Sequence, residues 1–113
     1  MRIKVTTDLD GEPMTGGSNN SYVKIAFVAQ TLPCLRGVPG VAPWNAVALD
    51  AWATRSRPRP SPEQRYAVQF LLSIWDSQSE WRSGCFDVMG ALLVWDRQHR
   101  EAFLSWARNP WWI

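Results

Sequence analysis

Residues 61–81, SPEQRYAVQFLLSIWDSQSEW, carry the clearest structural signal in the chain. Ser61, Pro62 and Glu63 form a typical helix start: a capping hydroxyl, a proline at the first helical position and an acid in the first turn. We therefore predict an amphipathic helix from Pro62 to about Trp81. Its polar stripe comprises Arg65, Gln69, Ser73, Asp76 and Glu80, and its apolar stripe comprises Tyr66, Ala67, Phe70, Leu71, Ile74 and Trp81.

Two more helices are predicted, one on each side of this segment. Residues 44–55 repeat apolar side chains at helical spacing, and Pro43 suits the first position. After residue 85 the helical spacing continues to residue 108, where Asn109 and Pro110 end it, so we predict one helix over 85–108. Two helices broken at Asp96 are the alternative. The residues that repeat at helical spacing along this last segment are Val88, Leu92, Trp95, His99, Phe103 and Trp106.

The N-terminal part of the chain has a different character. Residues 2–6, RIKVT, and 22–28, YVKIAFV, are rich in β-branched and aromatic side chains and predict an antiparallel pair of strands. Residues 31–43 contain three prolines and two glycines, which favours irregular structure. The predicted class is α+β: a single domain over 1–113, with a small antiparallel β-hairpin packed against about three helices.

The composition is that of a globular protein with many tryptophans. The chain has 113 residues, 46% of them hydrophobic and 19% charged, and includes eight tryptophans. Trp111 and Trp112 follow Pro110 directly, so they cannot easily face the same way. We expect one to complete the core, so that deleting residues 110–113 destabilises the domain, and the other to be an exposed anchor for a partner. The remaining tryptophans, expected in the core, are Trp44, Trp52, Trp75, Trp81, Trp95 and Trp106.

The sequence favours a cytoplasmic location. The longest apolar run, residues 88–95, is far shorter than the roughly 18–20 residues that span a bilayer, and no secretory signal pattern is present. No membrane association is therefore predicted. Cys34 and Cys85 are expected to be free thiols, with a disulfide between them left open.

One short motif at the N-terminus suggests chemistry. Asp8-Leu9-Asp10-Gly11 resembles the first motif of haloacid-dehalogenase-like phosphatases, in which one aspartate is the nucleophile and the other a general acid. Glu12 departs from that motif, and the rest of the chain lacks the alternating strands that such a sheet needs. We interpret Asp8 and Asp10 as a turn, and a small enzyme that uses them is an alternative.

The other reactive side chains do not form a recognisable catalytic or metal site. Cys85, at a predicted helix start, would lie about 21 Å from His99 on one continuous helix, since the rise is about 1.5 Å per residue. Only a broken helix could bring the two together. His99 is interpreted as a packed core or interface histidine. Two cysteines and one histidine cannot complete a four-ligand zinc site alone, so neither a metal nor another cofactor is predicted.

A cluster of arginines lies around the prolines of residues 55–62. It comprises Arg55, Arg57 and Arg59, with Arg65 just beyond. We interpret the segment as a stiff, solvated linker, while an arm that binds nucleic acid is the alternative. The net charge of +2 is too small to argue for nucleic acid by itself.

The functional prediction is a non-enzymatic module that binds or occludes a partner protein through Arg55, Arg57, Arg59, Arg65, Trp111 and Trp112. Small single-domain inhibitors of host machinery encoded by phages or mobile elements, such as anti-defence proteins, would act in this way. Two alternatives are a nucleic-acid-binding protein that uses the Arg55–Arg65 segment and a homodimer that buries its surplus tryptophans.

Overall fold

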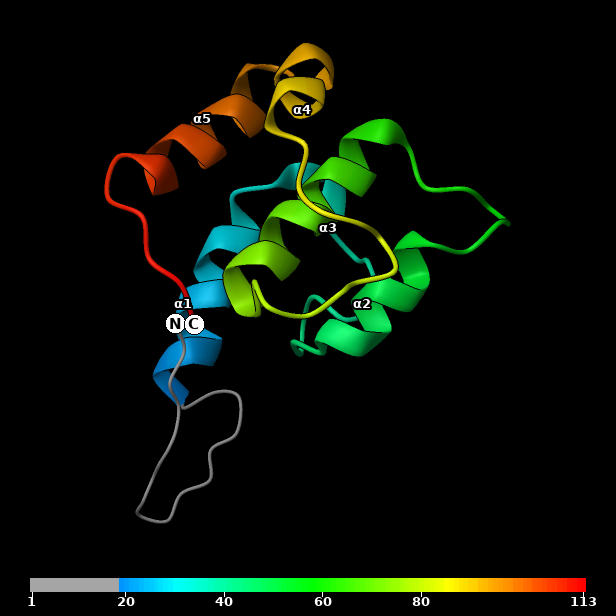
Figure 1. The fold of residues 1–113 in the computed structure, drawn as a ribbon, viewed down its shortest axis with the longest axis horizontal. Helices are drawn as coiled ribbons and strands as arrows, with labels where there is room; N and C mark the ends of the chain where they lie inside the picture. Colours follow the sequence, from blue (N-terminus) through cyan, green and yellow to red (C-terminus); the bar gives the residue numbers. More distant parts are fainter. Residues whose placement is uncertain (1–18) are drawn as a thin grey trace.

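In a computed structural model, which describes residues 19–113, these residues form α-helices joined by loops and one turn of 3₁₀ helix (Figure 1). No strand or sheet occurs within 19–113, so the predicted α+β class and its β-hairpin are wrong for the described chain. The helices are α1 (Asn19–Gln30), η2 (Pro33–Leu35), α2 (Ala46–Ala53), α3 (Pro62–Trp75), α4 (Val88–Val94) and α5 (Arg97–Ala107).

Helix α1 occupies the place of the second predicted strand. Ile25, Val28 and Ala29 are buried at helical spacing, which puts them on one side of the helix. The preference of β-branched residues for strands depends on what they pack against, and here a helix buries them against its neighbours. Residues 2–6, the other predicted strand, lie outside the described residues.

Helix α3 lies in the middle of the molecule and contacts α1, α2, α4 and η2 (Figure 1). Its predicted start is confirmed by a capping box: Ser61 Oγ accepts from the Gln64 N–H at 3.2 Å, and Gln64 Oε1 accepts from the Ser61 N–H at 2.9 Å. The helix ends at Trp75 rather than near Trp81, because the Asp76 side chain binds the next turn instead. Its carboxylate accepts from the Gln78 N–H at 3.1 Å.

The predicted polar stripe of α3 is wrong at Gln69. This side chain is buried and donates through Nε2 to the Ser83 carbonyl at 2.7 Å, in the loop that follows α3. The same loop is held from α2 by the buried Asp50, whose carboxylate accepts from the N–H groups of Arg82 and Ser83 at 3.0 and 2.8 Å. Two buried polar side chains thus position residues 82–83 over the core.

The predicted single helix over 85–108 is wrong, and the alternative break at Asp96 is confirmed. Asp96 begins α5, since its Oδ1 accepts from the His99 N–H at 3.0 Å. Trp95 has extended backbone and is 1% exposed, and its indole N–H donates to the Glu63 carbonyl at 3.1 Å. Burying this indole and capping α5 together favour the bend over a continuous helix.

The N-terminal end of α2 is set by a local hydrogen bond. Helix α2 begins after Asn45, whose side chain accepts from the Ala48 N–H at 3.0 Å, so Pro43 precedes the helix instead of opening it. Residues 31–43 are largely irregular, as predicted, apart from η2.

The core is strongly aromatic, as the tryptophan content predicts. Phe70 of α3 lies at its centre, with ring centroids 5.3 Å from Phe86, 5.5 Å from Phe103 and 5.4 Å from Trp106. Trp95 is buried, while Trp44, Trp52, Trp75, Trp81 and Trp106 are half-buried and pack against the core.

Candidate interaction surface

Helix α4 presents apolar side chains to solvent. Its sequence, VMGALLV, contains no polar side chain, and only Ala91 is buried. Met89 and Leu93, which are four residues apart and therefore lie on one side of the helix, are 71% and 87% exposed. Val88 and Val94 flank them and are about one-third exposed, at 37% and 38%. We call the side chains Val88, Met89, Leu93 and Val94 the α4 face.

Helix α4 also packs closely on α3. A Cβ atom at Gly90 would lie 2.5 Å from the Tyr66 hydroxyl oxygen, so this helix position accepts only glycine without a shift of the tyrosine. Asp87 caps α4, since its Oδ1 accepts from the Gly90 N–H at 3.0 Å. A helix that is apolar on all sides is ordinarily buried, yet only one side of α4 is covered.

Sequence reasoning overlooked the α4 face. From the sequence, the apolar run over residues 88–95 indicates only a segment too short for a bilayer and the first part of the predicted helix over 85–108. The signal that could have revealed it is the absence of any polar position on a short helix that ends at a capped bend. Such a helix cannot turn a polar side toward water, so whichever side is left uncovered is apolar.

The predicted arginines are exposed, but they are not equivalent. Arg55 is engaged within the molecule: its Nε–H donates to the Pro58 carbonyl at 3.1 Å, and its guanidinium lies 5.7 Å from the Trp52 ring. Arg57, Arg59 and Arg65 form no ion pair with any residue in 19–113. Three guanidinium groups are therefore available to a partner.

Of these three arginines, Arg65 lies close to α4, whereas Arg57 and Arg59 belong to the connection from α2 to α3. The connection from α2 to α3 projects from the body, and it leads into the end of α3 that lies beside α4 (Figure 1). Arg65 stands in the first turn of α3, next to Tyr66, the residue against which Gly90 of α4 packs. The candidate interaction surface is the α4 face together with Arg65 beside it.

The C-terminal tryptophans lie elsewhere, beside α1 and far from the projecting connection (Figure 1). Trp111 is half-buried, with Lys24 Nζ 5.0 Å from its ring centroid, and its carbonyl accepts from the Trp106 indole N–H at 2.9 Å. Trp112 is 58% exposed and meets Trp106 edge-on. One ring packs and the other is exposed, as predicted, but the six predicted site residues do not form one surface.

Two further exposed apolar regions do not define a free surface. Val23 and Phe27 are 66% and 69% exposed on α1, but that helix follows directly on residues 1–18. Val47 on α2 is 72% exposed, and an isolated apolar side chain of this kind is ordinary on a protein surface.

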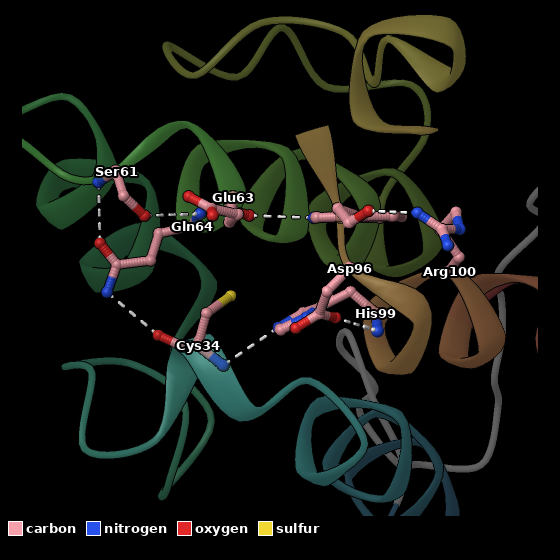
Figure 2. Close-up of polar contacts among 8 residues, drawn as sticks. Cys34, Ser61, Glu63, Gln64, Asp96, His99 and Arg100 are labelled. Atoms are coloured by element: carbon pink, nitrogen blue, oxygen red, sulfur yellow. Dashed lines mark hydrogen bonds and ion pairs between the residues drawn. The ribbon is translucent and has the colours of Figure 1, made fainter. Parts of the chain in front are cut away.

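A polar network centred on Cys34 and His99 joins η2 to α3 and α5 (Figure 2). Asp96 Oδ1 lies 2.7 Å from His99 Nδ1, and His99 Nε2 accepts from the Cys34 backbone N–H at 3.2 Å. Because Nε2 is the acceptor, the proton of a neutral ring sits on Nδ1, facing Asp96. The Cys34 carbonyl accepts from Gln64 Nε2 at 3.0 Å.

Asp96, His99 and Cys34 are the residue types of a nucleophilic triad, but their geometry differs from one. His99 receives the backbone N–H of Cys34 in place of its thiol proton. Burial, with a smaller effect from the Glu63 carboxylate, raises the pKa of the Cys34 thiol to about 12, so the thiol is protonated at neutral pH. This trio therefore fixes the position of η2. His99 is 5% exposed beside Trp95, which confirms a packed histidine.

The remaining candidates for chemistry are not assembled in the described chain. Cys34 and Cys85 are free thiols, as expected, and both ring nitrogens of His99 are engaged away from the exposed Cys85. Asp8 and Asp10 lie outside the described residues. Within 19–113 no group of acidic, cysteine and histidine side chains could hold a metal ion, and no helix has the length and apolar character needed to cross a membrane.

Compared with models of known protein families, with curated proteins and with solved structures, the chain matches none.

Proposed function

We propose that the protein is a non-enzymatic binding module that docks through the α4 face onto an apolar, acid-flanked segment of a partner protein. The observation that carries this proposal is the exposure of Met89 and Leu93, at 71% and 87%, on a helix without polar side chains. Covering a Leu or Met side chain contributes roughly 1.5–3 kcal/mol. Covering the α4 face would thus contribute a large binding free energy from a small apolar area.

The residue types support a protein partner. Interfaces are enriched in methionine and arginine, with an apolar centre and a polar rim. Methionine adapts its shape to a partner better than branched side chains do. Arg65 beside the face, and Arg57 and Arg59 on the connection that leads into α3, form no ion pair within residues 19–113 and favour carboxylates, which a guanidinium binds with two parallel hydrogen bonds. A partner segment with apolar anchors and flanking Asp or Glu residues fits both features.

The mechanism that follows is occlusion. A small module bound over an apolar, acid-flanked site would prevent other molecules from binding to that site on the partner. An inhibitor encoded by a phage or mobile element, such as an anti-defence protein, is the specific form that we propose, supported by the exposed apolar side chains of the α4 face.

The test is capture of partners from cells of the source organism with three tagged forms of the full chain: wild type, Leu93→Glu and Val47→Glu. Val47 is a matched control, because it is also an exposed apolar residue but lies on α2. We expect a protein that wild type and Val47→Glu recover and that Leu93→Glu loses, with at least a roughly tenfold weaker Kd for the purified pair. Equal recovery by all three forms would contradict the proposal.

Two further measurements separate the other hypotheses. Light scattering that shows a dimer for wild type and a monomer for Leu93→Glu would replace the partner with a second copy. Binding to a duplex DNA or RNA probe that weakens steeply with salt and is lost in an Arg57→Gln, Arg59→Gln variant would favour nucleic acid instead.

A further inference from the structure

A pocket of about 460 Å³ opens beside η2, away from the α4 face. It lies between the end of α1, η2 and residues 36–42, and its size is within the roughly 300–1,000 Å³ typical of small-molecule sites. Most of its walls are apolar, with Leu32, Pro33, Val38 and Val41 among them. A pocket of this kind suits the apolar part of a small ligand.

One wall of the pocket is held by the polar network of Figure 2. Cys34, in the middle of η2, is bound from both sides: its N–H donates to His99 Nε2 at 3.2 Å and its carbonyl accepts from Gln64 Nε2 at 3.0 Å. These bonds tie η2 to α5 and α3. The wall that contributes Leu32 and Pro33 is therefore fixed before any ligand arrives.

The wall formed by residues 36–42 is held in place by the close approach of its backbone to the backbone of α2. Gly40 has a φ of +92°, and a Cβ atom there would lie 2.6 Å from the backbone nitrogen of Leu49 in α2. Any other residue would push the loop away from α2. The loop that carries Val38 and Val41 is thus seated tightly on the body, and Val38 is itself buried. A preformed pocket loses little free energy when it orders around a ligand.

The polar groups at the pocket indicate the charge of the ligand. Arg36 is the charged residue of the lining, its side chain is exposed, and it forms no ion pair within residues 19–113. A guanidinium binds a carboxylate through two parallel hydrogen bonds. A single guanidinium beside apolar walls matches one negative charge on an apolar body, whereas a phosphate dianion would call for more donors.

We propose that this pocket binds small amphipathic monocarboxylates, with the apolar chain among Leu32, Val38 and Val41 and the carboxylate at Arg36. This site is independent of the proposed protein-binding function, because its lining includes no residue of the α4 face and none of Arg57, Arg59 and Arg65. A bound carboxylate would therefore leave the α4 face free to bind its partner.

The test uses octanoate as the probe and octanol as its uncharged counterpart, followed by amide NMR shifts and calorimetry on the full chain. We expect saturable binding of octanoate, with shifts concentrated in residues 29–42, and binding of octanol at least roughly tenfold weaker because the charged contact is lost. Absence of saturable shifts in residues 29–42 with millimolar octanoate would overturn the proposal.

Four variants sharpen the test. Arg36→Gln should weaken octanoate roughly tenfold and bring its Kd close to that of octanol, while Arg82→Gln, an exposed arginine elsewhere, should leave it unchanged. Ala42→Trp, at an exposed residue of the lining, should fill the pocket and abolish binding. Octanoate that binds Arg36→Gln or Ala42→Trp as it binds wild type would also overturn the proposal. Leu93→Glu should keep octanoate binding, which separates this site from the α4 face.

Discussion

Helices α3 and α4 are both rich in apolar side chains, but they use them in opposite ways. Helix α3 buries Phe70 and six other residues, and Phe70 is in contact with aromatic rings from two later segments, the loop before α4 and helix α5. Helix α4 buries only Ala91 and leaves Leu93 87% exposed. Apolar side chains in α3 therefore stabilise the fold, whereas those in α4 are available for binding. The predictions below test this difference, beginning with the largest expected effect.

Phe70→Ala should be the most damaging single substitution. Removing a buried phenylalanine costs about 3–5 kcal/mol of unfolding free energy, since both the transfer of the ring and the cavity left behind contribute. Equilibrium urea unfolding followed by tryptophan fluorescence measures this loss. A change below about 1 kcal/mol would show that Phe70 is not the centre of the core.

Deletion of residues 110–113 should destabilise the domain by about 2–3 kcal/mol, through two lost hydrogen bonds and lost ring packing. The Trp106 indole loses the Trp111 carbonyl, and the Ile74 carbonyl loses the Ile113 N–H, which donates to it at 3.0 Å. Trp112→Ala is the control and should cost less, because it keeps both backbone contacts. An unchanged melting temperature after the deletion would make this segment a surface feature like the α4 face.

The bend between α4 and α5 predicts a pH effect. Hydrogen bonds from the His99 backbone N–H and ring lower the pKa of Asp96 below its ordinary value of 3.8. The ionised carboxylate therefore adds stability above pH 3.8, and this contribution is lost as the pH falls through the lower folded-state pKa. In urea unfolding between pH 5 and pH 2.5, wild type should lose more stability than Asp96→Asn. Parallel pH profiles would contradict the role of the cap.

Leu93→Ala should have the smallest effect, with unfolding free energy within about 0.5 kcal/mol of wild type, because the side chain already lies in water. The same urea experiment compares it directly with Phe70→Ala. A loss above about 2 kcal/mol would place Leu93 in the core and remove the basis of the proposed docking surface.

Some features that depend on neighbouring residues were predicted correctly, whereas the start of α2 after Asn45 and the end of α3 before Asp76 were not. The start of α3 at Ser61 depends on a hydrogen bond to Gln64, and the exposure of the arginine segment depends on its prolines and charges. The cap at Asp96, which reaches only to His99, was foreseen as an alternative. The α4 face was missed because its exposure depends on what the other helices leave uncovered.

The sequence by itself determined the helical start signals, the aromatic core and the exposed arginines, since these depend on local hydrogen bonds, hydrophobicity and charge. Only the tertiary structure decided that residues 22–28 form a helix, that Trp112 is the exposed ring of its pair and that Leu93 faces solvent. The reason is physical: burial is a property of the whole assembly of helices, and the same apolar segment can face the core or the solvent according to its neighbours.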